Sequence, residues 1–144
     1  MSLDGDYEDG NIFARILRGE IPSARVYEDE NVLAFMDAFP QARGHTLVVH
    51  RRSRARNLLE IEPEALNQLM AGVQKVARAM RAALKPDGII VTQFNGAPAG
   101  QTIFHLHFHL LPRWEGTEIG EHGRGQSEPG ELAALARQIA AEVR

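Results

Sequence analysis

The apolar residues of this chain recur with helical spacing in three stretches. The longest stretch begins at Pro63 and carries apolar side chains at intervals of three and four residues from Leu66 to Leu84, which predicts a long amphipathic helix. Asn11 is a suitable cap for a short helix, and a last helix is predicted over roughly residues 131–143. Each of these helices has one apolar face that must pack against another element.

Alternating or short apolar runs predict five strands among these helices. The five segments are residues 24–28, 32–37, 45–50, 89–94 and a last one that begins at His105. The first two predict a hairpin, whereas the fourth is apolar on both faces at its start and is expected to be central in the sheet. The links are mostly of hairpin length, so we predict an α+β fold: a five-stranded antiparallel sheet with one long helix and short flanking helices.

Composition and charge narrow the class of protein. The chain has 144 residues, 44% of them hydrophobic, and we expect one folded domain over residues 11–114. Residues 1–10 are acidic with little to bury and are expected to form a disordered tail. Residues 115–144 are expected to form a mobile loop, with an exposed His122, followed by the last helix.

The same numbers exclude several kinds of partner. A net charge of −3 argues against nucleic-acid binding, and no apolar run approaches the length of a membrane span. The absence of cysteine excludes disulfides and thiolate metal sites. We therefore expect a cytoplasmic protein that needs no cofactor and binds neither nucleic acid nor membrane.

The chemistry of the chain is concentrated in three histidines. His105, His107 and His109 alternate with apolar residues, which is typical of a half-buried strand and predicts that all three imidazoles share one face. Neighbours on that face are roughly 6.6 Å apart along the backbone, so only His107 neighbours both of the others. Imidazole titrates near neutrality and can act as nucleophile, general acid or metal ligand.

The loop before this strand is suited to an anion. Gly96 and Gly100 permit positive φ and close backbone approach, so that consecutive amides can point into one concavity. Asn95, Gln101 and Thr102 add neutral donors. No lysine follows the glycines, so the loop is not a nucleotide P-loop.

Three interpretations of the histidines remain open at this point. They can form a solvated polar face, a metal site for zinc or iron, or the centre of phosphoryl or nucleotidyl transfer through His107. The metal interpretation lacks a nearby carboxylate other than Glu115, whereas the glycine loop favours a phosphate. The arginine-rich run of residues 51–56 is either a solvated connection or an attraction for a polyphosphate.

Residues 105–111 read His-φ-His-φ-His-φ-φ, where φ is apolar, and this resembles the signature of the histidine-triad superfamily. The resemblance covers roughly residues 11–114 and is closest to the nucleotide-binding branch. Its other matching segments are Asn11-Ile-Phe-Ala-Arg-Ile, Gly19-Glu-Ile-Pro22, Phe35-Met-Asp37, Gly44-His-Thr-Leu-Val-Val49 and Asn95-Gly-x-x-x-Gly100-Gln101.

The resemblance implies a homodimer with a continuous sheet and a purine nucleotide or nucleotide conjugate as ligand. The residues it implies for the nucleotide site are Phe13, Ile16 and Ile21 for the base, with Phe35 near the base and Asp37 for the ribose. Relatives often carry a further histidine near Ser53; His50 lies a few residues earlier, and we assign neither a role.

The implied reaction is attack of His107 on the α-phosphorus of a nucleoside phosphoramidate or related conjugate, giving a nucleotidyl-histidine that water hydrolyses. His105 and His109 would flank the phosphate, and Asn95, Gln101 and Thr102 would stabilise its charge. Superfamily transferases tend to carry glutamine at the position of His109, so the histidine favours hydrolysis. Three alternatives stay open: a dinucleoside polyphosphate hydrolase, a nucleotide-dependent regulatory module with little turnover, and a metal-dependent hydrolase with the three histidines as ligands.

Overall fold

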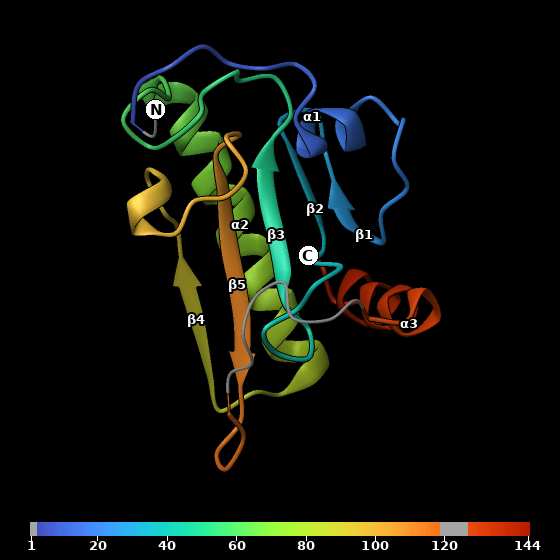
Figure 1. Cartoon of the computed structure of the whole chain (residues 1–144). Coiled ribbons are helices and arrows are strands. Elements are labelled where there is room, and N and C mark those ends of the chain that lie inside the picture. The colour runs from blue at the N-terminus through green and yellow to red at the C-terminus, as the bar shows by residue number, and fades with distance from the viewer. Residues whose placement is uncertain (1–2, 119–126) are drawn as a thin grey trace.

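The computed structural model describes residues 3–118 and 127–144, which form one antiparallel sheet with helices on both faces (Figure 1). The sheet has five strands in the order β1-β2-β3-β5-β4. The strands are β1 (Arg25–Glu28), β2 (Val32–Met36), β3 (Thr46–His50), β4 (Gly88–Thr92) and β5 (His107–Arg113). Every neighbouring pair is antiparallel, which confirms the predicted α+β fold and the β1–β2 hairpin. The expectations for His122 and most of the loop around it lie outside the described residues.

The prediction that the fourth strand is central is wrong. Strand β4 lies at an edge and pairs only with β5 among the described strands. Its apolar residues Ile90 and Val91 are 37% and 46% exposed. An apolar run on both faces is typical of a strand with two neighbours. Because the described strands give β4 only one neighbour, burial between two strands does not explain this pattern.

The histidine strand begins two residues later than predicted. Strand β5 starts at His107, which is opposite Val49 of β3. Immediately before it, the amide of Leu106 donates to the carbonyl of Ala55 at 3.0 Å. The backbone at His105 therefore follows the loop of residues 51–57 rather than the sheet.

The helices begin and end where capping residues allow. Helix α1 (Ile12–Leu17) is capped by Asn11, whose side chain accepts from the amide of Ala14, and the turn after the helix contains Gly19 at a φ of 80°. Helix α2 (Pro63–Leu84) starts with proline in its first turn. Helix α3 (Pro129–Ala140) starts two residues before the predicted boundary. None of the helices in the described ranges is long and apolar enough to cross a membrane.

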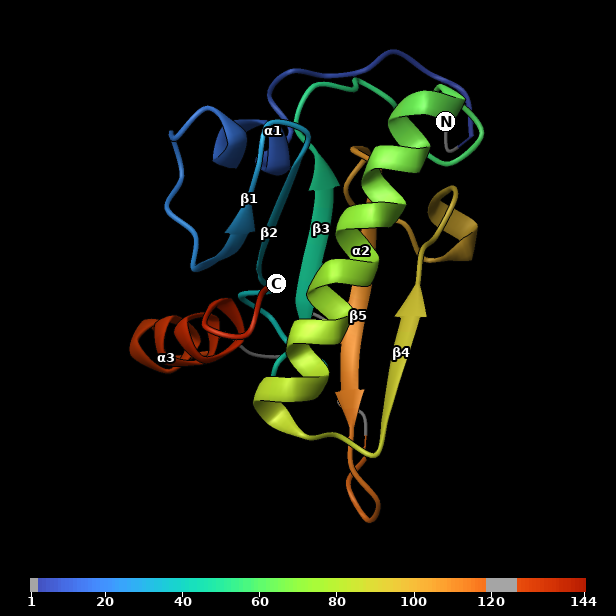
Figure 2. The same cartoon turned by 180° about the vertical axis from the view of Figure 1, so that it is seen from behind.

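The two faces of the sheet bury different clusters. Helices α2 and α3 cover the face where Val48, Leu106 and Leu110 join the larger core, and Figure 2 shows α2 lying along β3 and β5. Helix α1 lies on the opposite face and buries a smaller cluster that includes Phe13 and Phe35. Burying an aliphatic or aromatic side chain of this size contributes on the order of 1.5–3 kcal/mol. The histidines of β5 project toward the smaller cluster.

The acidic N-terminal segment, for which composition predicts a disordered tail, makes polar contacts with the folded domain in this structure. Residues 3–10 run from the start of α2 across the end of the sheet to α1 (Figures 1 and 2). The carbonyl of Leu3 accepts from the side chains of Arg56 at 3.3 Å and Asn57 at 3.0 Å, and Asp9 forms an ion pair with Arg54. These contacts use backbone carbonyls and charged groups rather than apolar side chains.

Candidate active site

A cavity of about 650 Å³ opens on the sheet face that carries α1. It brings together eight of the site residues predicted from the sequence. They are Phe13, Ile16, Ile21, Phe35, Asp37, Thr102, His107 and His109. These residues come from α1, the loop after it, β2 and its end, and the segment from the glycine loop into β5, so distant parts of the chain meet at one site.

One end of the cavity is apolar and aromatic. The ring of Phe13 meets the ring of Phe35 edge-on, with 5.4 Å between centroids. It also meets the ring of His107 edge-on at 4.8 Å. Leu47 and Ile103 continue the lining. Aromatic and branched aliphatic side chains of this kind make a slot that suits a flat, apolar ring system beside the imidazole.

The tautomer of His107 is fixed by the backbone. Its Nδ1 lies 2.7 Å from the carbonyl oxygen of His105. A carbonyl can only accept, so Nδ1 carries the proton. In the neutral ring Nε2 then keeps its lone pair, which is the state that a nucleophile requires.

His109 is oriented by a histidine that the sequence reasoning missed. The backbone amide of Gln41 donates to Nδ1 of His45 at 3.1 Å, so that the proton of neutral His45 lies on Nε2. This Nε2 is 3.0 Å from Nδ1 of His109 and donates to it. The proton of neutral His109 is therefore on Nε2, and the two histidines that line the cavity are held in opposite tautomers.

Asp37 joins this chain of contacts at the cavity wall. Its Oδ1 accepts from the amide of Phe39 at 2.8 Å, and its Oδ2 is 3.5 Å from Nε2 of His45. The carboxylate is 5% exposed. Being both buried and at the cavity wall, it is placed to accept hydrogen bonds from a polar part of a ligand.

The residues that are able to hold a metal ion differ from the predicted ones. Among the described residues, Asp37, His45 and His109 form a group whose ligand atoms lie within 4.8 Å of one another. The three triad histidines do not converge, because Nδ1 of His107 is bonded to a carbonyl and His105 lies outside the cavity lining. The short contact between His45 and His109 already has a proton donor and an acceptor, so a metal would have to displace that proton.

His105 is buried away from the cavity. Its side chain is among the buried polar groups at 2% exposure, and its Nδ1 is 2.7 Å from the hydroxyl of Tyr7. Burial lowers the pKa of His105 to about 4, the nearby His107 adds to the decrease, and a hydrogen bond with the backbone of His50 opposes it. The ring is neutral at physiological pH, and its own contacts are with protein groups.

The glycines of the loop have the predicted positive φ values, but amides of the loop donate to carbonyls within the loop itself. Gly96 and Gly100 have φ values of 91° and 112°, in the region open to glycine, on either side of the 3-10 turn η1 (Ala97–Ala99). The amides of Ala99 and Gln101 both donate to the carbonyl of Gly96, at 3.1 Å each. The expectation of a ring of amides around an anion therefore does not describe this part of the loop.

The side chains of Gln101 and Asn95, the two predicted amide donors, hydrogen-bond to the backbone and hold the loop in place. The side chain of Gln101 accepts from the amide of Gly96 at 2.9 Å and donates to the carbonyls of Arg56 at 2.7 Å and Ile103 at 3.0 Å. The side-chain oxygen of Asn95 accepts from the amide of Leu58 at 2.9 Å. Thr102, by contrast, lines the cavity.

The arginine-rich run is largely engaged in contacts within the chain. Arg51 donates to the carbonyl of Asp29 and pairs with Glu28, and Arg54 pairs with Asp9. Arg56 is 2% exposed. The contacts of Arg51 and Arg54 fit the interpretation of the run as a connection, whereas the burial of Arg56 differs from the solvated side chains that this interpretation expects.

Three parts of the site were not found from the sequence. The alternation of residues 45–50 predicts His45 only as the start of a strand, and the matching segment Gly44-His-Thr-Leu-Val-Val49 is the signal that includes it. His50, considered there as a further histidine, instead accepts from the amides of Arg52 and Ser53 at 3.0 Å each. Helix α3 contributes Leu132 and Ala133 to the cavity wall, and Tyr7 reaches His105. No sequence pattern places these last two.

Comparison with known proteins gives a consistent result. Residues 18–116 match the HIT domain family. The Protein hit of Bacillus subtilis is 45% identical over 103 residues, which cover 72% of this chain and 70% of that protein. A solved HIT-like protein of Bartonella henselae is 47% identical with a TM-score of 0.88 over 95% of this chain and 99% of that chain.

Two further solved structures are similar to this chain and have informative names. A hypothetical histidine triad nucleotide-binding protein of Sulfolobus tokodaii is 33% identical with a TM-score of 0.83, covering 91% of this chain and 90% of that chain. A HIT family hydrolase of Clostridium thermocellum is 32% identical with a TM-score of 0.66, covering 76% of this chain and 96% of that chain.

Proposed function

The chain belongs to the HIT domain family, and from this premise we propose that it is a nucleotide-binding hydrolase that cleaves a bond at the α-phosphorus of its substrate through His107. The proposed substrates are nucleoside phosphoramidates or related nucleotidyl conjugates, preferably of purines. The names of the similar Sulfolobus tokodaii and Clostridium thermocellum proteins, a nucleotide-binding protein and a hydrolase, support the two halves of this proposal.

The observation that carries the proposal is the hydrogen bond of 2.7 Å from Nδ1 of His107 to the carbonyl of His105. It places the lone pair of the neutral ring on Nε2 and opposes a flip of the ring. A nucleophile must also leave well in the second step, and imidazole meets both requirements near neutrality. A purely structural histidine does not need one tautomer at the wall of an open cavity.

The shape of the cavity supports a nucleotide as the ligand. The base would lie in the apolar slot lined by Phe13, Phe35, Ile16 and Ile21. The buried carboxylate of Asp37 would accept hydrogen bonds from the ribose hydroxyls. The α-phosphate would then reach Thr102 and the two cavity-lining histidines.

The proposed reaction has two displacements. Nε2 of His107 attacks the α-phosphorus, and the bond from phosphorus to the leaving nitrogen or oxygen breaks with its electron pair. The leaving atom accepts a hydrogen bond from Nε2 of His109 and takes a proton from solvent. Water then attacks the nucleotidyl-histidine and releases its proton to solvent, which frees the nucleoside monophosphate and restores His107. Thr102 and the Nε2 proton of His109 would stabilise charge on the phosphate oxygens. Gln101 and Asn95 would contribute by holding the loop that positions Thr102.

We also propose that the protein acts as a homodimer in which β4 of each copy lies at the interface. The exposed apolar residues Ile90 and Val91 are on the edge strand, where a second copy would extend the sheet. An uncovered apolar edge strand is unfavourable in an isolated molecule. Pairing of two edges would remove it.

The decisive experiment compares His107→Ala with the unaltered protein on a nucleoside phosphoramidate. We expect turnover to be abolished while a nucleoside monophosphate still binds. His50→Asn is the matched control, because it also removes an imidazole but keeps an acceptor for the amides of Arg52 and Ser53. Turnover retained in His107→Ala would exclude His107 as the nucleophile.

Two further measurements separate the remaining alternatives. Parallel assays on a phosphoramidate and on a dinucleoside polyphosphate identify the leaving group, and tight nucleotide binding with very slow turnover of both would indicate a regulatory module. Prolonged chelator treatment should leave activity intact. Loss of activity that zinc restores would support a metal site at Asp37, His45 and His109.

A further inference from the structure

Residues 3–10, which we name the N-terminal strap, are fixed at both ends. At one end the carbonyl of Leu3 accepts from Arg56 and Asn57. At the other end the carbonyl of Glu8 accepts from the side chain of Asn11 at 2.8 Å and from its amide at 3.1 Å. The strap therefore joins the loop of residues 51–57 to the start of α1.

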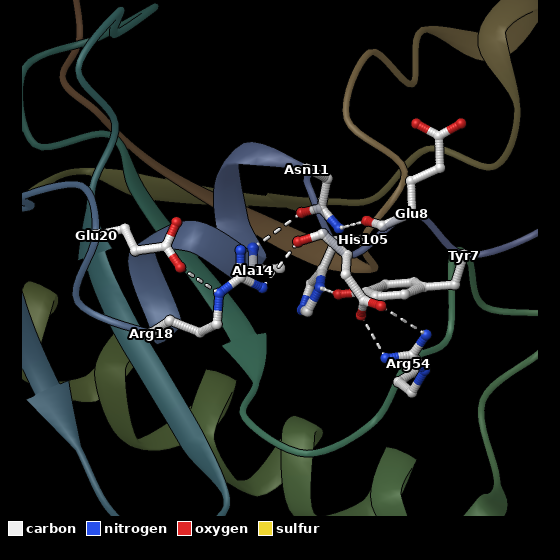
Figure 3. Close-up of polar contacts among 9 residues, drawn as sticks. Tyr7, Glu8, Asn11, Ala14, Arg18, Glu20, Arg54 and His105 are labelled. Atoms are coloured by element: carbon white, nitrogen blue, oxygen red, sulfur yellow. Dashed lines mark hydrogen bonds and ion pairs between the residues drawn. The ribbon is translucent and has the colours of Figure 1, made fainter.

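The α1 end of the strap is also tied to the helix that lines the cavity. Asn11 caps α1 with the same side chain that holds Glu8, since its oxygen accepts from Ala14 while its nitrogen donates to the strap (Figure 3). Arg18 donates to the carbonyl of Asp9 at 2.8 Å. The segment between these anchors has little freedom to move relative to α1.

Tyr7 lies between the anchors and points at the first histidine of the motif (Figure 3). Its hydroxyl oxygen is 2.7 Å from Nδ1 of His105, and the two ring centroids are 5.7 Å apart. The guanidinium carbon of Arg54 lies 4.6 Å from the centroid of the Tyr7 ring, and Arg54 is itself held by Asp9. A cation over the ring draws electron density from the phenol and makes its hydroxyl a better donor.

The contact with Tyr7 fixes one side of the His105 ring. A Tyr7 hydroxyl that donates to Nδ1 places the proton of neutral His105 on Nε2. The hydrogen bond restricts the orientation of the ring, although the ring does not line the cavity. The backbone carbonyl oxygen of His105 is two bonds from the Cα atom that carries this ring. It accepts the hydrogen bond from Nδ1 of His107.

We propose that Tyr7 is a positioning residue of the active site, whose hydroxyl holds His105 so that the His105 carbonyl stays on the Nδ1 proton of His107. This inference rests on the proposed function, because it assigns to the strap the alignment of the proposed nucleophile. It also gives the first histidine of the motif a role distinct from that of the other two. His105 acts through its backbone carbonyl, and the contact between its ring and the strap keeps that carbonyl in position.

A phenylalanine would pack as well as tyrosine at this position, so the hydroxyl is the feature to test. Tyr7→Phe removes the donor and keeps the ring over which Arg54 lies. Tyr27→Phe is the matched control, because the chain has two tyrosines and the Tyr27 hydroxyl also makes a 2.7 Å hydrogen bond, to Asp29 far from the cavity lining.

We expect Tyr7→Phe to lower kcat on a nucleoside phosphoramidate by about tenfold with KM within about twofold, less than the ~100-fold that a misplacement of about 1 Å can cause. Tyr27→Phe should leave both constants unchanged. Equal kinetic constants in Tyr7→Phe and the unaltered protein would overturn the inference.

A spectroscopic measurement tests positioning independently of turnover. The ring nitrogens of His105 should show one tautomer, with the proton on Nε2, in ¹⁵N NMR of the unaltered protein, and a mixture in Tyr7→Phe. An unchanged His105 spectrum in the variant would overturn the inference. If the unaltered protein turned over no nucleotide conjugate, the proposed function would fail, while this spectrum would still decide whether Tyr7 controls His105.

A second variant separates the hydroxyl from the docking of the strap. Asp9→Asn weakens the ion pair with Arg54 and leaves the Tyr7 hydroxyl in place. It should lower kcat less than Tyr7→Phe does. A loss as large as that of Tyr7→Phe would assign the effect to docking of the strap and overturn the role of the hydroxyl.

Discussion

Acidification should destabilise this protein through His105 in particular. Burial holds the pKa of this imidazole at about 4 in the folded protein, against an ordinary value of 6.5 in the unfolded chain. Above pH 6.5 both states are neutral and His105 has no effect on stability. As the pH falls from there toward 4, the unfolded chain takes up a proton that the folded protein resists, so the free energy of unfolding decreases.

The size of this effect follows from the difference between the two pKa values. One pKa unit corresponds to about 1.4 kcal/mol, so lowering the pH from about 7 to about 5 should reduce the free energy of unfolding by about 2 kcal/mol through His105. The full difference of about 3 kcal/mol is reached only below pH ~4. The ring is almost completely buried, so solvent screening does little to reduce these values.

Urea unfolding, followed by the fluorescence of the single tryptophan Trp114, measures this effect at both pH values. The comparison protein is His105→Asn, which does not titrate but keeps a polar group near the position of Nδ1. The other histidines titrate in both proteins, so their contribution cancels in the difference. The variant should lose about 2 kcal/mol less than the unaltered protein. Equal losses in the two proteins would refute the assignment of His105 as a buried neutral group.

Three other substitutions test separate features of the site and fold. His45→Leu removes the donor to Nδ1 of His109 and should lower kcat about 10- to 100-fold. His45→Gln can keep an N–H at this position and should lower kcat less. Equal decreases in kcat in the two variants would argue against a hydrogen-bonding role of His45. Gly44→Ala should reduce the free energy of unfolding, measured by urea unfolding, by about 2–4 kcal/mol. Gly44 has a φ of 88°, which strains an alanine, and the added Cβ would lie 2.9 Å from Cγ of Pro112. Val91→Lys on the edge strand should convert a dimer to a monomer in analytical ultracentrifugation, and an unchanged mass would exclude β4 from the interface.

The sequence predicted those parts of the structure that depend on repeated side-chain patterns. The apolar stripe of α2 and the alternation in β3 reflect one buried face each, and a buried face is a property that a sequence displays directly. The glycine positions were also predictable, since Gly96 and Gly100 do take the positive φ values expected of them. The polar groups of the loop were not, because a sequence does not reveal that Gln101 finds its partners in the backbone.

The contacts of the N-terminal strap are of a kind that amino-acid composition does not display. Its acidic composition predicts disorder, because it has few apolar side chains to compensate for the loss of chain entropy. Its contacts instead come from the carbonyls of Leu3 and Glu8, which every residue type possesses, and from one aromatic hydroxyl. The position of β4 differs from the prediction for a related reason: an apolar run does not reveal whether a strand has one neighbour or two in the sheet.

The three histidines of the motif are chemically identical, so the differences among them must come from the groups that surround them. A backbone carbonyl places the proton of His107 on Nδ1, and a backbone amide, acting through His45, places the proton of His109 on Nε2. One ring therefore presents a lone pair to the cavity and the next presents an N–H donor, which suit a nucleophile and a group that stabilises charge in a displacement at phosphorus. Both assignments depend on main-chain groups that cannot change protonation, so they persist wherever the rings stay neutral. This division of roles explains how two neighbouring neutral imidazoles can serve one as nucleophile and the other as hydrogen-bond donor to the phosphate or the leaving group.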